Sequence, residues 1–187
     1  EEPSLVPSPG VNYGSGAAKK FGVPGAMAAA ETSMIARDIA LSLDTGARVL
    51  FQHVSSGQSA ALIRAGKALG AKIYAEVTPH HLSLTEDDVP AHGTYARMNP
   101  PLRKEADRQA LIEALADGTI DMIATDHAPH TAEEKARDFA KAPSGITGLE
   151  TAFSVCNTYL VQTGRLTPMQ LLEKMSRNPA EIYGLTG

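Results

Sequence analysis

Five histidines and one aspartate gather in three short stretches of this sequence. Each stretch follows a short apolar run, and together they contain His53, His80, His81, Asp126, His127 and His130. Neutral imidazole and carboxylate groups are both zinc ligands, and both can accept or donate a proton during catalysis. The residue types therefore indicate a metal site or an acid–base site, and their spacing alone does not choose between the two.

The histidines also have structural explanations. A single histidine at the end of a strand, such as His53, is more often a hydrogen-bonded group than a metal ligand. His80 and His81 are adjacent and point to opposite faces if the chain is extended, so at most one can face a site. We predict structural support, rather than metal binding, for both. His127 could also be structural, and His92 is most simply an exposed loop residue.

Two further candidates lie in segments that favour turns. Asp126 follows a predicted strand, and it could cap a helix or close a turn as readily as it could bind a metal ion. Asn99 precedes Pro100 and Pro101, and two prolines stiffen any backbone, so this segment could be only a rigid turn. The residue pattern alone leaves both alternatives open.

The elements that would position these groups alternate between helices and short apolar strands. Apolar spacing and stop signals predict helices over 28–43, 59–69, 104–115, 149–162 and 168–175, and strands over 48–53, 72–77 and 119–125. This alternation predicts an α/β fold with a parallel sheet, either a doubly wound sheet or a section of an eight-stranded barrel. In both folds the loops after the strands form the site, so the three stretches would meet at one mouth.

The composition predicts a globular chain with one domain over residues 1–187. Its 17 basic and 21 acidic residues are scattered and give a net charge of −4, which argues against nucleic acid as a partner. No run approaches the roughly 18 apolar residues of a membrane span, and the single cysteine, Cys156, cannot form an internal disulfide. We therefore expect a cytoplasmic location without a membrane partner. Both ends of the sequence look cut.

Five ordered strings carry a resemblance to a known family. They are QHVSS (52–56), AEVTPHHL (75–82), RMNPPLR (97–103), GTIDMIATDHAPH (118–130) and GITGLETA (145–152). In this order and spacing they closely resemble bacterial dihydroorotases, which are zinc-dependent amidohydrolases. The resemblance covers residues 28–185. It implies the reversible hydrolysis of L-dihydroorotate to N-carbamoyl-L-aspartate in de novo pyrimidine biosynthesis.

The resemblance also implies a fold and a set of site residues. The chain would form a partial (β/α)8 barrel of the TIM type, about strands six to eight with their helices. Two zinc ions would lie at the C-terminal mouth of the complete barrel. His53 would ligate one zinc ion, while Asp126 would bind the other and act as the catalytic acid/base. Asn99 and His130 would bind substrate, and Ser144-Gly145 would contact it through the backbone.

Several features of the resembled family lie outside this sequence. The N-terminal half-barrel, which carries most of the metal ligands and the group that bridges the zinc ions, is absent. The small C-terminal β-domain is absent as well. The chain would therefore supply one ligand to each zinc ion and no bridge, so we expect the isolated chain to be inactive.

Two other functions fit the resemblance less well. One is a non-catalytic, dihydroorotase-like scaffold subunit of an aspartate transcarbamoylase complex, but such homologues typically lose the metal residues, whereas His53, Asp126 and His130 are present. The other is a different cyclic amidase, such as a hydantoinase or an allantoinase. Asn99 together with His130 favours a carboxylated substrate instead. The expected partners are a small-molecule substrate and, for assembly, a second copy of the chain or aspartate transcarbamoylase.

Overall fold

Three short parallel strands form the centre of the fold. The computed structural model describes residues 1–185. Strands β1 (Val49–Phe51), β2 (Ile73–Val77) and β3 (Met122–Ile123) lie in the order β1-β2-β3, and both pairs are parallel. This arrangement confirms the predicted α/β fold with a parallel sheet.

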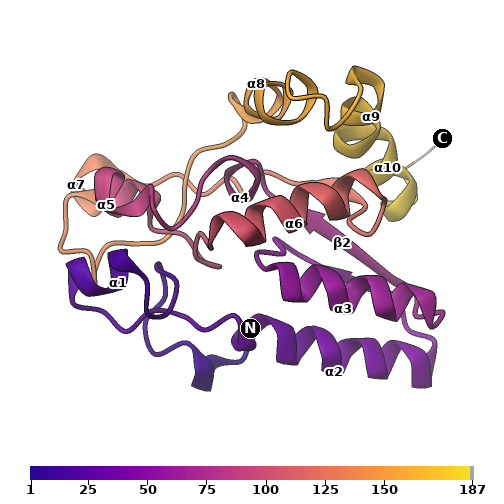
Figure 1. Cartoon of the computed structure of the whole chain (residues 1–187), viewed down its shortest axis with the longest axis horizontal. Helices are drawn as coiled ribbons and strands as arrows, with labels where there is room; N and C mark the ends of the chain where they lie inside the picture. Colours follow the sequence, from indigo (N-terminus) through magenta and orange to yellow (C-terminus); the bar gives the residue numbers. More distant parts are fainter. Residues whose placement is uncertain (186–187) are drawn as a thin grey trace.

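Three long helices each precede one strand. They are α2 (Ala29–Thr45), α3 (Gly57–Ala68) and α6 (Glu105–Ala116), and Figure 1 shows them side by side with β2 behind them. All three correspond to helices predicted from the sequence. In the part of the chain that the structure describes, no helix has the length and apolar character needed to span a membrane.

The remaining helices are short. They are α1 (Gly16–Phe21), α4 (Pro79–Ser83), α5 (Val89–His92), α7 (Ala132–Lys135), α8 (Ala152–Cys156), α9 (Pro168–Leu172) and α10 (Asn178–Tyr183). Two 3-10 turns lie at Pro3–Leu5 and Gly93–Ala96, and π-helical turns at Asn157–Val161 and Glu173–Arg177 continue α8 and α9. The helices predicted over 149–162 and 168–175 are therefore present, each with a π-helical part.

A close approach between two helices and the sheet fixes the main core. A Cβ atom at Gly66 would lie 2.9 Å from the Cδ1 atom of Ile73 and 3.0 Å from the side chain of Ile39, so a larger residue would displace these side chains and glycine favours the close packing of α3 against β2 and α2. Ile35 and Ile39 are both buried, at the spacing of four that predicted this helical face. Burying each isoleucine stabilises the fold by about 2 kcal/mol. The packing thereby sets the position of the strands whose ends carry the site.

Two strands are shorter than the sequence predicted. Strand β1 ends at Phe51 rather than at His53, because His53 has a left-handed φ of 40° that leaves the strand conformation. The strand predicted over 119–125 is reduced to β3, because the side chain of Asp121 accepts the N–H of Ala75 at 2.8 Å in place of a backbone carbonyl. The apolar runs in the sequence do not show the turn at His53 or the side-chain bond of Asp121.

The N-terminal segment packs against the long connection between β2 and α6. A second apolar cluster joins them and contains Val11, Ala17, Ala18, Val89, Ala96, Met98, Leu102 and Phe139. The rings of Phe21 and Phe139 stack with their centroids 4.1 Å apart. Gly10 forms an isolated antiparallel bridge with Met98. This cluster supports the segment around Asn99, and its short helices carry no long apolar period by which the sequence could have predicted them.

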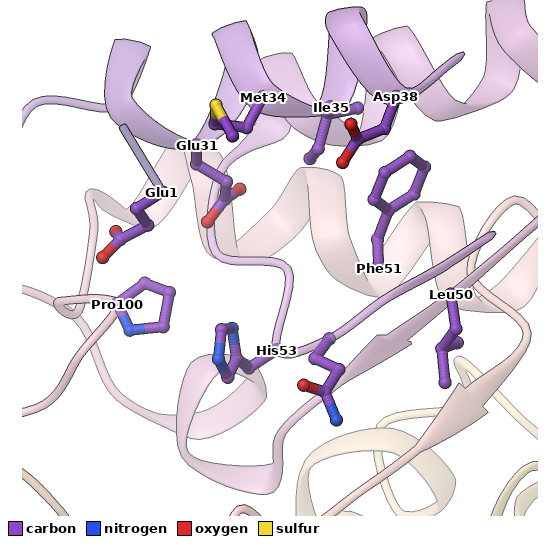
Figure 2. Close-up of a pocket in the computed structure, with 10 residues that line it drawn as sticks. Glu1, Glu31, Met34, Ile35, Asp38, Leu50, Phe51, His53 and Pro100 are labelled. Atoms are coloured by element: carbon purple, nitrogen blue, oxygen red, sulfur yellow. The ribbon is translucent and has the colours of Figure 1, made fainter. Parts of the chain in front are cut away.

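The two outer strands each have an unpaired edge, since β1 and β3 pair only with β2 among residues 1–185. Beside β1 a cavity of about 220 Å³ opens toward α2, and Met34, Ile35, Leu50 and Phe51 form its apolar part (Figure 2). An unpaired edge beside apolar side chains is a template for pairing with another chain. The sheet therefore presents two surfaces for association.

The isolated chain should self-associate through these edges. Replacing Leu50 by Lys places a charge beside the β1 edge and should reduce association, because charged side chains discourage edge-to-edge pairing. Sedimentation velocity at several protein concentrations measures the effect. The matched control is Leu69→Lys at the end of α3, where the side chain is 70% exposed and association should not change. A monodisperse monomer with a sharp, cooperative melt would contradict the prediction.

Candidate active site

The backbone turns sharply just after β1 and β3, at the two residues for which the family resemblance implies metal binding. His53 has a φ of 40° and Asp126 a φ of 48°, and they are the only residues other than glycine with positive φ in the range 1–185. This conformation costs roughly 1–2 kcal/mol for a residue with a Cβ atom. Strain of this kind persists where the surrounding structure enforces it, and it is concentrated at functional sites.

One cavity gathers most of the predicted substrate-binding residues. It has a volume of about 190 Å³ and is lined by His80, Met98, Asn99, Asp126, Ala128, Ser144, Gly145 and Ile146. Asn99, Asp126 and Ser144-Gly145 come from three separate segments, and the structure brings all of them to this cavity. We call it the Asp126 cavity. It lies at the carboxyl ends of β2 and β3, where the chain leaves the parallel sheet.

The structure places His53 in a different cavity. Its ring lines the 220 Å³ cavity beside β1, together with Glu1, Glu31 and Pro100 (Figure 2). The Nδ1 atom of His53 is buried and has no hydrogen-bond partner among the described residues. A buried polar atom without a partner costs free energy unless a ligand satisfies it. His53 is thus suited to bind a ligand from the side of the open β1 edge.

Glu76 interacts with both His53 and Asp126, and the sequence did not predict it as a site residue. Its carboxyl group lies near the end of β2 and is 7% exposed. Burial raises the pKa of this carboxyl group, the amide and charge of His53 oppose the rise, and the charge of Asp126 adds to it. The carboxyl group therefore lies close to both strand-end residues. A charged residue inside an apolar strand was the signal that could have identified it.

His130 lies behind the wall of the Asp126 cavity. Its Nε2 atom donates a hydrogen bond to the carbonyl of Ser144 at 2.9 Å, and its ring lines an adjacent cavity of about 180 Å³ that also contains Gly145. The structure therefore places His130 next to the other predicted substrate-binding residues, with the backbone of Ser144-Gly145 between them. His127 has a structural bond, since its Nδ1 atom accepts the N–H of Gly148 at 2.9 Å.

The adjacent histidines have separate roles in helix α4 and do not lie in an extended segment. The Nδ1 atom of His81 is 2.8 Å from the hydroxyl of Thr78, and its Nε2 atom donates to the carbonyl of Pro100 at 3.2 Å. His80 lines the Asp126 cavity instead. Burial lowers the pKa of His80 to about 2 and that of His81 to about 3, with neighbouring histidines adding to the effect. Both rings are therefore neutral at physiological pH.

A buried carboxylate holds the turn that follows His53. Glu31 on α2 accepts the N–H of Ser55 at 3.1 Å, the hydroxyl of Ser55 at 2.6 Å and the N–H of Ser56 at 3.2 Å. Arg103 donates from Nε to the Ser55 hydroxyl at 3.2 Å and from Nη1 to Asn12 at 2.7 Å. We call this set the Glu31 network. It connects α2, the turn after β1 and the N-terminal segment.

The residues present fit a metal ion only in part. The unpaired Nδ1 atom of His53 and the exposed carboxylate of Asp126 are suitable donors, each at a strand end. Over residues 1–185, however, no three His, Cys, Asp or Glu side chains come together as a group that could hold a metal ion. The described chain therefore offers isolated ligands and does not form a complete metal centre by itself.

Comparison with known proteins identifies the class. Residues 15–187 match the amidohydrolase family, and the chain belongs to that family. Among solved structures, L-hydantoinase (dihydropyrimidinase) from Arthrobacter aurescens superposes with a TM-score of 0.78 at 33% identity, over 82% of this chain and 35% of that one. D-hydantoinase (dihydropyrimidinase) from a Thermus species superposes with a TM-score of 0.78 at 31% identity, over 84% of this chain and 36% of that one.

Curated relatives with higher sequence identity share one name. "Dihydroorotase" from Clostridioides difficile is 56% identical over 185 residues, which is 99% of this chain and 44% of that protein. "Dihydroorotase" from Clostridium acetobutylicum is 50% identical over 185 residues, again 99% of this chain and 43% of that protein. The chain thus spans less than half the length of these relatives.

Removing the charge of Glu31 should destabilise the fold. Glu31→Gln replaces one acceptor oxygen by an NH2 group that cannot accept a backbone N–H, and we expect a loss of about 1–3 kcal/mol of unfolding free energy. Urea denaturation measures it. Glu133→Gln, at an exposed position of α7, is the matched control. Equal stability of the two variants would show that the network is not needed.

The buried histidines predict a loss of stability in mild acid. The unfolded chain binds protons near pH 6.5, whereas the folded chain cannot protonate His80 and His81 until about pH 2 and 3. The free energy of unfolding should therefore fall as the pH drops from 6.5 toward 4, by up to about 1.4 kcal/mol per pH unit for each histidine. Urea midpoints at pH 7.5 and 5 test this. His81→Gln should weaken the pH dependence of the unfolding free energy, whereas His92→Gln, at an exposed position, should leave it unchanged. A weaker dependence in His92→Gln alone would show that His81 does not cause the loss of stability.

Proposed function

We propose that this chain forms part of the catalytic barrel of a dihydroorotase, which hydrolyses L-dihydroorotate reversibly to N-carbamoyl-L-aspartate. The observation that carries the proposal is the Asp126 cavity, where one carboxylate meets Asn99 and the Ser144-Gly145 backbone at the carboxyl ends of two strands. The relatives named dihydroorotase, at 50–56% identity over nearly the whole chain, support it. The structural neighbours named hydantoinase are 33% identical at most among those compared above and favour that reaction less.

Strands β1 to β3 would be strands six to eight of a (β/α)8 barrel. Their parallel order and the helix before each of them support this assignment. The open edges of β1 and β3 would then pair with strands of the rest of the barrel. In that arrangement His53 and Asp126 face one mouth from the first and last of the three strands.

His53 and Asp126 would hold zinc in the complete protein, one ion each, with further ligands from the rest of the barrel. The partnerless Nδ1 atom of His53 supports this role. A bound zinc ion lowers the pKa of water toward about 7 and polarises a carbonyl group. That chemistry suits a cyclic amide, which is not activated for hydrolysis. The presence of both ligands at strained strand ends favours a catalyst over a non-catalytic scaffold subunit.

Asp126 would move the proton. Its carboxylate would accept a proton from the attacking water and deliver it to the departing ring nitrogen. Asn99 and the backbone of Ser144-Gly145 would bind the substrate and fix the geometry of attack, since they line the same cavity. His130 would contact the substrate carboxylate directly only if its bond to Ser144 opens; otherwise it supports the cavity wall.

Substituting His53 and substituting Asp126 should impair the enzyme in different ways. The test uses a hybrid enzyme in which residues 1–185 replace the matching part of the Clostridioides difficile relative. Asp126→Asn should keep most of its zinc while kcat falls about 10²–10⁴-fold, because the general acid/base is lost. His53→Ala should lose zinc first and recover part of its activity with added metal. Zinc analysis and steady-state kinetics on dihydroorotate measure both effects.

The unsubstituted hybrid and the isolated chain are the controls. The hybrid should turn over dihydroorotate, and the isolated chain should not, because it lacks a complete metal centre within residues 1–185. A fully zinc-loaded Asp126→Asn hybrid with near-parental kcat would refute the proton-transfer role. The base would then have to be another group near the cavity, such as His80 or Glu76.

A further inference from the structure

We propose that Arg97 and Lys135 form a buried pair of cations that positions the Ser144-Gly145 wall of the Asp126 cavity and selects an anionic substrate over a neutral one. The inference rests on the proposed function, because it concerns the same cavity. Arg97 lies two residues before Asn99, and Lys135 ends helix α7, so the two cations reach the wall from different segments.

Lys135 holds the Ser144-Gly145 wall by donating hydrogen bonds to backbone carbonyls. The side chain is buried, with 4% exposed, and Nζ donates to the carbonyls of Thr94 at 3.1 Å, Pro143 at 3.0 Å and Gly145 at 2.6 Å. These three bonds use all three protons of the ammonium group. All three acceptors are neutral carbonyls, so the hydrogen bonds are satisfied while the positive charge is not neutralised.

Arg97 holds the same wall through the Ser144 hydroxyl and the Gly145 N–H. Its Nη1 atom donates to the hydroxyl of Ser144 at 2.5 Å, and its carbonyl accepts the N–H of Gly145 at 2.9 Å. The side chain is confined, because a Cβ at Gly10 would lie 2.5 Å from its Cγ atom and the ring of Phe139 lies 5.8 Å from its guanidinium carbon. Its Nε atom is buried without a hydrogen-bond partner among residues 1–185.

The two charges lack a compensating anion. Neither Arg97 nor Lys135 forms a salt bridge with a carboxylate in the described part of the chain. Burial lowers the pKa of both side chains, and for Lys135 the charge of Arg97 lowers it further. Two buried cations close together are costly, and a purely structural link would be more stable if a carboxylate were included. The arrangement fits an anion bound on the other side of the wall.

Gly145 joins Lys135 to the Asp126 cavity, because its carbonyl accepts from Lys135 and its backbone lines the cavity. It lines both this cavity and the adjacent one that contains Lys135 and His130. Its φ of 136° and the 2.7 Å approach of a Cβ here to the Ala128 side chain both require glycine, so the wall carries no side chain at this position. Ala128 and Ile146 also line both cavities. Arg97 and Lys135 are thus positioning residues: they hold the wall and add positive potential to the cavity, without contacting the reacting atoms.

The test compares two ligands with the same ring and different charge, the ester being larger by one methyl group. Orotate and its neutral methyl ester are used as competitive inhibitors of the hybrid enzyme acting on dihydroorotate. An inhibition constant does not depend on the fraction of active protein, so partial misfolding of a variant does not obscure it. In Lys135→Met and Arg97→Met the constant for orotate should rise about tenfold, the effect of removing one charge roughly 10 Å away at an effective dielectric constant near 20. The constant for the ester should change less than about twofold, because a neutral ligand gains little from a distant charge.

Three controls separate charge from structure. Lys141→Met removes an exposed lysine near the same helix, with 78% of its side chain exposed, and should change neither constant. Arg97→Lys keeps the charge without the guanidinium bond to Ser144, and it should bind orotate better than Arg97→Met does. Zinc content should stay at the parental value in all variants.

The outcomes also separate this inference from the proposed function. Equal increases for orotate and the ester in both methionine variants, with parental zinc content, would overturn the charge role and leave only a structural one. Unchanged constants would overturn the inference altogether. An unsubstituted hybrid that melts cooperatively and contains zinc, yet does not act on dihydroorotate, would refute the proposed function instead.

Discussion

The left-handed turns at His53 and Asp126 are the constraint on which the site depends. A strand that continued straight would carry these side chains past the sheet, whereas the turns bring each one back to a cavity at the strand end. Each turn is unfavourable by itself, so the surroundings must stabilise it. The Glu31 network holds the turn after β1, and the bonds from Ala128 to Ile146 and from Gly148 to His127 hold the turn after β3.

The metal side and the substrate side of the site are built differently. On the proposed metal side, two donors lie at strand ends and no group of three ligands forms among residues 1–185, so the proposed zinc centre would need further ligands. On the substrate side the cavity wall is already rigid, because Gly145 is bonded through its N–H to Arg97 and through its carbonyl to Lys135. In the proposed function, the described chain therefore contributes a preorganised wall for substrate and some of the metal ligands.

The sequence predicted the elements better than it predicted the details of the site. Apolar spacing identified α2, α3, α6 and the three strands because each is a continuous segment that buries one face. It could not show that Asp126 and Asn99 share a cavity while His53 lines another, since that depends on φ angles and on packing between distant segments. Glu76 and Lys135 were missed because a single charged residue in a short segment shows its burial only in the folded chain.

The most direct measurement is anomalous scattering at the zinc absorption edge from crystals of the hybrid enzyme. We expect zinc peaks within about 2.0–2.2 Å of a ring nitrogen of His53 and of a carboxylate oxygen of Asp126. We also expect that both residues keep the positive φ angles seen here. Zinc bound elsewhere in the protein, with Asp126 turned away from it and His53 bonded to protein atoms instead, would show that these two strand ends do not form the metal side of the site.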